Sequence, residues 1–524
     1  MGLQSLGLSL SLTLTVGFTF DLASPYENKQ FGFSIKPLKD WRAVPPQPGE
    51  DHLVVRYVSK SDQFSKDGGR YNPAQEILVF QKESITGNAS DPQPSKEELE
   101  KLRKEVGDDV VIKGLKFETF ADYLDSMKSR YQIVGEPRKC EINKIPCTVY
   151  EILVEGWTEE MSQKAYVFSG GASIEVAITY QSLTASLQKI ERDFEQSART
   201  FKFIDKGKAD DRKAEKIDKG MSGVKDAETE AFLKKQIGAL PPGWKWAWSD
   251  KDVRRYLLLY NCEEKEVRPL GLHLEAMRDY YEEVFPPDHP LTAISIVRLC
   301  GDHDTYQAYG GPQGSGGYWA SSQQELVVFI DKARDRNSVY SVISHEAFHQ
   351  YIFYFYGELA PHSWYNEGHG DYFGGAVMSK TGRKVQKIEP LNLTSYPRLN
   401  MIRERLRQNA HVPLRKFLAY SQREYYNNDI GYNYAQGWSM VYFLRKAKKE
   451  GARFLDEWDL ILDTYLQNLV AARDELSQGE NPPNKFMIEE QAQKKGYGST
   501  FGGWTDAQWA ELEEAWKAFY VGGG

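Results

Sequence analysis

Short alternating runs of apolar and polar residues dominate the N-terminal part of the chain and predict β-strands. Helical spacing of apolar residues, three and four apart, interrupts these runs. We therefore expect residues 26–205 to form an α+β accessory domain, a mixed α/β sandwich-like unit. The expected strands are Phe31–Ile35, Leu53–Tyr57, Ile77–Phe80, Cys147–Val154 and Ser173–Thr179, and the expected helices are Lys96–Val106, Phe117–Tyr131 and Thr184–Thr200.

In the order of these elements the expected domain resembles the small α/β sandwich of a photosystem oxygen-evolving subunit.

The C-terminal part has a different pattern, in which strands come first and helices follow. This order predicts an α+β fold class for residues 239–524 as well, with a helical C-terminal part. The expected strands are Tyr256–Tyr260, Ala293–Leu299 and Glu325–Asp331. The expected helices are Leu270–Val284, 339–356, 403–420, 433–449, 453–476 and 506–520.

Two further segments differ in composition from the predicted domains. Residues 206–238 begin with charges of both signs and few large apolar residues, which is typical of a charged linker or a solvated helix. Residues Leu6–Phe20 contain no charged side chain, and the run is too short for a bilayer span of about 20 residues. With Ala23 and Ser24 as small residues near a cleavage point, residues 1–24 are expected to be a signal peptide. The alternation from Leu8 to Thr15 leaves a leading strand as the alternative.

Composition narrows the classes of function. A net charge of −8 over 524 residues argues against a nucleic-acid-binding protein, which typically carries an excess of basic residues. No later apolar run is long enough to span a membrane, so with the signal we expect an extracytoplasmic protein, secreted, periplasmic or envelope-associated. Its four cysteines contain no Cys-x-x-Cys motif, which argues against a thiolate zinc site. Two pairings are open in an oxidising compartment, Cys140 with Cys147 and Cys262 with Cys300, and four free thiols are the alternative.

The candidate chemistry is concentrated in one His-Glu-x-x-His segment. His345 and His349 are four residues apart in a predicted helix and therefore share one face, from which both imidazoles can bind one metal ion. Glu346 follows His345 directly, so its carboxylate can contact a metal-activated water instead of the metal. The pattern suits one Zn²⁺ per chain.

A second predicted helix supplies the rest of the site. Glu367 can be the third metal ligand, which leaves the fourth position of a catalytic zinc for water. Asp371, one helical turn later, can accept the free ring N–H of a ligand histidine from the second shell of the metal. Asn337 or Ser338 is expected to cap the first helix, Gly357 to end it, and Ser363 to cap the second.

These residues resemble a known family. His345-Glu346-x-x-His349 followed by Trp364-Tyr365-Asn366-Glu367-Gly368 is similar to the gluzincin zinc metallopeptidases, closest to their peptidase-MA-like, aminopeptidase-N-related branch. The resemblance implies a zincin fold, zinc ligation by His345, His349 and Glu367, and Glu346 as general base. Tyr434-Ala435-Gln436-Gly437-Trp438 resembles the segment that carries the oxyanion-donating tyrosine in that branch, which assigns this role to Tyr434. A core aromatic at Tyr434, or Tyr432 in its place, stays open.

The chain also departs from the family. The Gly-x-Met-Glu-Asn segment with which aminopeptidases bind a free amino terminus is missing, and Gly316–Ser322 stands in the comparable stretch. An extended substrate could instead pair with the strand Glu325–Asp331 as a sheet edge. A metzincin would need glycine and histidine where Ile352 and Phe355 stand, and an aspzincin would use Asp371 as third ligand.

Together these patterns predict a zinc-dependent metallopeptidase that hydrolyses peptide bonds of a peptide or protein substrate. Two alternatives remain. One is a zinc hydrolase of another amide or ester. The other is a catalytically inactive envelope binding module on a peptidase-like scaffold. The sequence leaves the substrate, endo- or exo-cleavage and the oligomeric state open.

Overall fold

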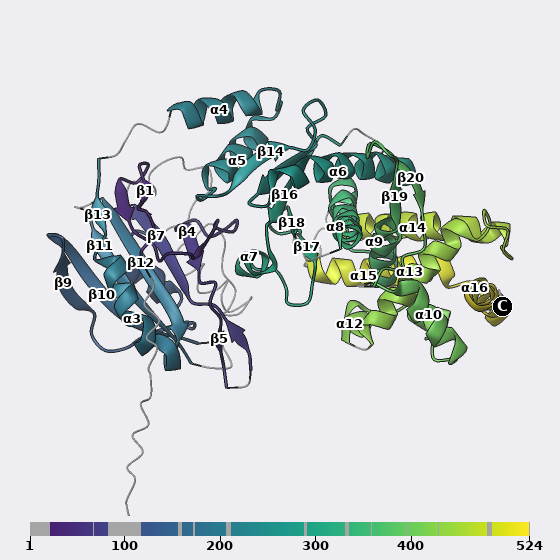
Figure 1. Cartoon of the computed structure of the whole chain (residues 1–524). Coiled ribbons are helices and arrows are strands. Elements are labelled where there is room, and N and C mark those ends of the chain that lie inside the picture. The colour runs from purple at the N-terminus through teal and green to yellow at the C-terminus, as the bar shows by residue number, and fades with distance from the viewer. Residues whose placement is uncertain are drawn as a thin grey trace, which may run out of the picture. The chain divides into compact units, whose positions relative to one another are not determined.

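The computed structural model describes residues 21–66, 68–81, 117–155, 160–170, 173–205, 211–287, 291–330, 335–357, 359–394, 396–427, 429–478 and 485–522. The chain forms two compact units, Met1–Gly243 and Trp244–Gly524, shown in Figure 1. The first is rich in sheet and the second ends in helices, which confirms the α+β class with a helical C-terminal part. The predicted helix Lys96–Val106 and nearly all of the predicted signal peptide lie outside the described residues. Within them, no helix has the length and apolar character needed to cross a membrane.

An antiparallel sheet of eight strands organises the first unit. In spatial order it contains β3 (Arg42–Val44), β4 (Leu53–Val58), β7 (Ala74–Gln81), β12 (Ile174–Leu183), β11 (Met161–Ser169), β10 (Ile145–Val154) and β8 (Tyr131–Ile133), with β9 (Arg138–Ile142) also paired to β10. Smaller sheets join β1 (Tyr26–Asn28), β2 (Phe33–Ile35) and β13 (Lys202–Phe203), and β5 (Gln63–Phe64) with β6 (Arg70–Tyr71). All five predicted strands are present. β11, which the sequence analysis missed, lies between two of them.

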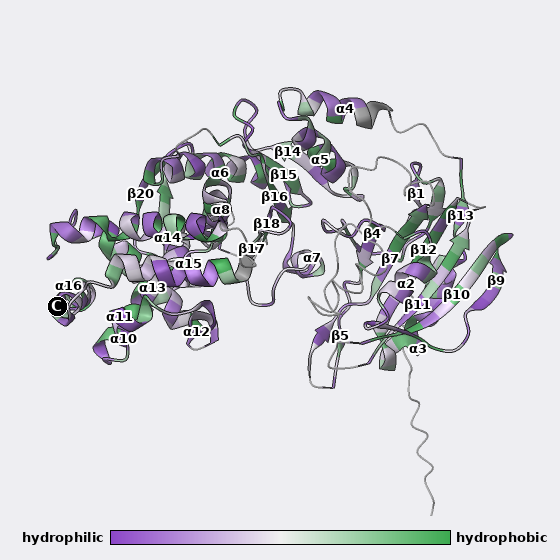
Figure 2. Ribbon diagram, turned by 180° about the vertical axis from the view of Figure 1, so that it is seen from behind, coloured by the Kyte–Doolittle hydropathy of each residue, from purple (hydrophilic) through white to green (hydrophobic). Residues whose placement is uncertain are grey.

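Helices pack on both faces of this sheet, because the strands alternate their side chains between two cores. Along β12, Val176 and Ile178 join the core beneath α3 (Thr184–Ala198), whereas Ala177 joins the core beneath α2 (Phe120–Ser126). The segment predicted as a charged linker or a solvated helix belongs to the first unit. Its described part contains α4 (Asp211–Met221), mainly hydrophilic in Figure 2, and α5 (Ala227–Gly238).

The second unit begins with a five-stranded sheet in the order β14 (Lys245–Trp248), β15 (Tyr256–Tyr260), β16 (Ser295–Cys300), β18 (Glu325–Phe329) and β17 (Gly317–Ala320). The three central strands are parallel and the outer two antiparallel. The prediction that the strand Glu325–Asp331 forms a sheet edge is therefore wrong. β17 covers β18 and is itself the edge, because the chain from Gly316 onward folds back as a hairpin.

Helices make up most of the remainder of this unit, together with one hairpin and a 3₁₀ turn. They are α6 (Glu264–Val284), α7 (His303–Ala308), α8 (Arg336–Tyr356), α9 (Ser363–Gly374), β19 (Ala376–Met378), β20 (Val385–Ile388), α10 (Arg398–Arg407), α11 (Leu414–Phe417), α12 (Gln422–Asn427), α13 (Ile430–Lys446), the 3₁₀ turn Asp456–Leu460, α14 (Ile461–Ser477), α15 (Lys485–Phe501) and α16 (Asp506–Val521). The single helix expected over 403–420 is wrong, because α10 ends at Arg407, Asn409 turns the chain with a positive φ of 49°, and Pro413 caps the separate helix α11.

Two buried histidines make this unit sensitive to acid. Burial lowers the pKa of His273 to about 4, and burial likewise lowers the pKa of His362 to about 4. His362 Nδ1 lies 2.6 Å from the Tyr465 hydroxyl, which also accepts from the His362 backbone N–H. The unfolded histidines bind protons below pH 6.5 that the folded ones do not. The free energy of unfolding therefore falls as the pH drops from 6.5 toward 4.

We expect His362→Gln to remove the part of the pH dependence of the free energy of unfolding that His362 contributes. Between pH 7 and pH 5 the wild-type free energy of unfolding should fall by about 2 kcal/mol more than that of the variant. Urea unfolding at both pH values measures the difference. Equal pH dependence in the two proteins would contradict a neutral, buried His362.

Candidate metal centre

Helix α8 carries both predicted histidine ligands on one face. Its N-cap is Asp335, whose side chain accepts from the backbone N–H groups of Asn337 and Ser338. The expectation that Asn337 or Ser338 caps the helix is thus wrong, because these residues already donate their N–H groups as first-turn residues. Gly357 ends the helix as expected, with a φ of 62° that favours glycine.

Buried hydrogen bonds hold α8 against α6 directly beside the first ligand. The His273 ring Nε2 lies 2.7 Å from the Ser344 hydroxyl, and the Tyr281 hydroxyl donates to the Ser344 carbonyl at 2.6 Å. Ser344 precedes His345, so these contacts fix the backbone from which His345 projects.

Glycines bring α9 close to its neighbours. A Cβ at Gly370 would lie only 2.7 Å from atoms of the His345 ring, and one at Gly368 only 2.6 Å from the Gly437 carbonyl oxygen of α13. Each glycine weakens a helix by about 1 kcal/mol relative to alanine. The close approach explains why this helix contains them nevertheless. Its N-cap is His362 and not the expected Ser363, which is already the first helical residue.

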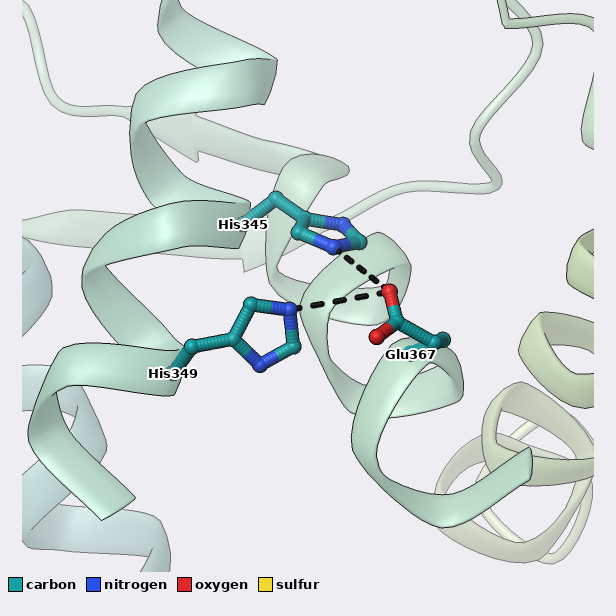
Figure 3. A group of neighbouring side chains, drawn as sticks. All are labelled: His345, His349 and Glu367. Carbon is teal, nitrogen blue, oxygen red and sulfur yellow. Dashed lines mark hydrogen bonds and ion pairs between the residues drawn. The ribbon is translucent and has the colours of Figure 1, made fainter. Parts of the chain in front are cut away.

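The three predicted ligands meet between α8 and α9, as Figure 3 shows. Glu367 Oε2 lies 3.1 Å from His345 Nε2 and 3.6 Å from His349 Nε2, and all three ligand atoms lie within 4.8 Å of one another. Ligand atoms of a tetrahedral zinc with bonds near 2.05 Å are about 3.4 Å apart. The three side chains are 12%, 12% and 9% exposed, so the group is mostly buried and a small part of it faces solvent.

The hydrogen bonds of the histidines select the ring form that binds metals. His345 Nδ1 lies 3.0 Å from Asp371 Oδ1, and His349 Nδ1 lies 3.1 Å from Asn366 Oδ1. Because both Nδ1 atoms face oxygen acceptors, each carries a hydrogen and Nε2 is the atom left for a metal, which on His345 would displace the proton that Nε2 shares with Glu367. Arg398 in turn donates from Nε to Asp371 Oδ2 at 2.6 Å.

Electrostatics keep the carboxylates ionised. Burial by itself raises the pKa of Glu367 and of Asp371, but their charged partners outweigh it. The two histidines hold the pKa of Glu367 well below its usual range, and Arg398 and His345 lower that of Asp371. Burial also lowers the pKa of His345, but its hydrogen bonds to Asp371 and Glu367 raise it well above the usual value. The site therefore attracts positive charge.

Glu346 is held apart from the three ligands. Its Oε2 accepts the backbone N–H of Trp319 on the edge strand β17 at 3.0 Å. Burial raises the pKa of Glu346, and the neighbouring histidines oppose this shift. A carboxylate with a raised pKa beside a ligand group is suited to taking up and returning a proton.

Tyrosines from α12 and α13 line the other side of Glu367. The ring of Tyr434 lies 6.3 Å from that of His345 and 6.3 Å from that of Tyr426. Tyr426 donates to Glu367 Oε1 at 2.7 Å, which leaves Oε2 facing the histidines. Tyr432 packs against Arg405, 3.8 Å from its ring centre to the guanidinium carbon.

His369 lies in the core and contacts residues other than the three candidate ligands. Its Nδ1 lies 2.8 Å from the Tyr365 carbonyl oxygen, and its Nε2 accepts from Arg445. Both ring nitrogens are thus engaged in the core, and His369 is not part of the candidate ligand group. The sequence analysis gave no role to Tyr426, Arg398 or the Trp319 N–H. Asn366 stands in the recognised motif directly before Glu367, and this position could have indicated its contact with His349.

Comparison with known proteins gives no function. Residues 339–458 match a family described as a protein of unknown function (DUF1570), and this segment contains His345, His349, Glu367, Tyr426 and Tyr434. No curated protein matches the chain.

Several solved structures are similar to part of the chain. The cyanobacterial PsbP (CyanoP) of Synechocystis sp. PCC 6803 is 12% identical, with 38% of this chain and 99% of that chain covered and a TM-score of 0.21. LpqN of Mycobacterium tuberculosis, involved in cell envelope biogenesis, is 9% identical over 34% and 90%, with a TM-score of 0.21. The protein of unknown function PA94 of Pseudomonas aeruginosa is 10% identical over 35% and 96%, with a TM-score of 0.17. Similarities this weak carry no functional conclusion.

The hydrogen bond that Tyr426 donates to Glu367 can be tested through metal affinity. We expect Tyr426→Phe to lower metal affinity about 10- to 100-fold, because Glu367 loses the partner that orients its carboxylate. Competition with a chromogenic chelator measures the dissociation constant. Tyr432→Phe, which alters a tyrosine packed on Arg405, is the control and should bind as wild type. Unchanged affinity in Tyr426→Phe would show that Glu367 does not depend on this bond.

Proposed function

We propose that the protein is a zinc-dependent metallopeptidase of the gluzincin type, with a zincin-like catalytic domain in its second unit. The observation that carries the proposal is the convergence of His345, His349 and Glu367, whose ligand atoms all lie within 4.8 Å of one another. Glu346 stands beside this group on the same helix, where a general base is needed.

The donor set fits zinc in number and kind. Two imidazoles and one carboxylate are the ligands of a catalytic zinc site that keeps a position for water. When bound in such a site, zinc lowers the pKa of water toward 7 and polarises the substrate carbonyl. The Nδ1 hydrogen bonds and the ionised Glu367 prepare the protein side for that ion.

Glu346 and Tyr434 have different roles in the proposed reaction, proton transfer and stabilisation of negative charge. Glu346 takes a proton from the attacking water and returns it to the leaving amine, and its bond to the Trp319 N–H holds it in place. The Tyr434 hydroxyl can donate to the carbonyl oxygen as that oxygen gains negative charge. Its pKa is raised by burial and by Glu367, so the phenol keeps its proton.

The edge strand supports a peptide as substrate. β17 pairs with β18 on one side, and no described strand pairs with its other side. An extended peptide can add to such an edge through backbone hydrogen bonds. Trp319 belongs to β17 and contacts Glu346, so a peptide on this edge would pass the general base.

Glu346→Gln tests the proposal most directly. We expect the variant to lose about 10²- to 10⁴-fold in peptide hydrolysis, because the amide cannot accept the proton, while zinc stays bound. Cleavage of an unfolded protein substrate, followed by mass spectrometry, gives the rate. Elemental analysis gives the zinc content.

Glu404→Gln, on the exposed face of α10, is the matched control and should hydrolyse as wild type. Equal rates in Glu346→Gln and wild type would contradict the general-base role. Zinc-loaded wild type that cleaves esters or other amides but no peptide would identify a different hydrolase. A zinc-loaded protein inactive on all of these would support a binding module.

A further inference from the structure

A two-residue hairpin in the first unit places two cysteines opposite each other. Asn143 and Lys144 form its turn, both with positive φ, 54° and 62°, as a tight turn of this kind requires. From this turn β9 and β10 pair in register, so that Ile142 faces Ile145 and Cys140 faces Cys147. A fixed turn allows no slippage that would separate the two thiols.

The distance between facing residues suits a disulfide. Directly opposed residues of an antiparallel pair have Cα atoms about 4.5 or 5.5 Å apart, depending on the hydrogen-bond pattern. Disulfides span Cα separations of about 4.4 to 6.8 Å. Both cysteines are free thiols in the structure. The register therefore places the two Cα atoms within the range that a disulfide spans.

The surroundings hold the hairpin in this geometry. The Asn143 amide donates to the carbonyl oxygens of Arg199 and Phe201, at 2.7 and 2.9 Å, and anchors the turn to the chain after α3. Cys147 is buried in the core beneath α3, and Cys140 is partly exposed at the rim of that core. The Cys140 sulfur can thus react with a reagent from solvent, and the Cys147 sulfur lies on the facing strand.

We propose that Cys140 and Cys147 are a disulfide-forming pair that closes the β9–β10 hairpin when the protein meets a small disulfide such as oxidised glutathione. This proposal is independent of the metal site. In the first step the Cys140 thiolate attacks the small disulfide, forms a mixed disulfide and releases one small thiol. The Cys147 thiolate then attacks the Cys140 sulfur and releases the second small thiol. The two protein thiols lose two protons and two electrons, which the small disulfide takes up.

The bridge would protect a vulnerable edge. β9 pairs with β10, and no other described strand pairs with it. A covalent link between the two strands prevents β9 from separating from β10, which stabilises the hairpin and keeps the part of β10 that β9 covers from becoming an open edge.

Cys262 and Cys300 provide an internal comparison. β15 and β16 pair in parallel with Tyr260 facing Leu299, so continuing the register sets Asn261, not Cys262, opposite Cys300. Cys300 is fully buried. We expect these two thiols to stay free under conditions that link Cys140 to Cys147.

The test uses the full chain equilibrated with mixtures of reduced and oxidised glutathione. Free thiols are then blocked by alkylation after unfolding, and peptides are mapped by mass spectrometry. We expect a peptide pair linked through Cys140 and Cys147, a mass lower by about 2 Da, and alkylated Cys262 and Cys300. Thermal unfolding of the oxidised protein should shift upward by about 5 °C, and Cys140→Ser should abolish the shift.

Two results would overturn the proposal. One is a glutathione adduct on Cys140 that persists without a bridge to Cys147. The other is full alkylation of both cysteines at every glutathione ratio. Both are read on the wild-type chain, so the outcome does not depend on how well the serine variant folds. Metal content and hydrolysis are separate measurements, so either proposal can fail alone.

Discussion

The close packing of α9 between α8 and α13 is the constraint on which the candidate site depends. Glu367 can reach His345 and His349 only because Gly370 lets the His345 ring lie against the helix backbone and Gly368 admits the carbonyl of Gly437. A methyl group at either glycine would enter space already filled by the neighbouring helix. The two glycines weaken the helix, but their small size lets the three ligand atoms lie within 4.8 Å of one another.

The same packing buries charge, and a chain of partners compensates for it. Arg398 pairs with Asp371, Asp371 with His345, and Tyr426 with Glu367, so each buried acid has a donor. Unpaired buried carboxylates would take up protons and lose their affinity for a cation. This compensation is what keeps the Nε2 and Oε2 atoms of the site available as ligands.

How far the sequence could predict this molecule depended on the range of each interaction. His345, His349 and Glu367 were predictable because helical spacing alone brings the histidines to one face and Glu367 follows in a recognisable motif. Tyr426 and Arg398 contact the site through tertiary packing and have no local pattern. β11 was missed because Met161–Ser169, at the centre of the sheet, is buried on both faces and shows no polar alternation. The edge position of β17 depends on a hairpin that apolar periodicity does not encode.

Metal content of wild type and Glu367→Ala, prepared side by side and measured by elemental mass spectrometry, tests the central claim most directly. The account predicts about one zinc per wild-type chain and a large loss of zinc in Glu367→Ala, since two histidines alone leave the ion under-coordinated. The far-ultraviolet circular dichroism of the two proteins, compared in parallel, checks that both are folded. Wild type that takes up no zinc even after reconstitution, or a folded Glu367→Ala that binds zinc as well as wild type does, would contradict it.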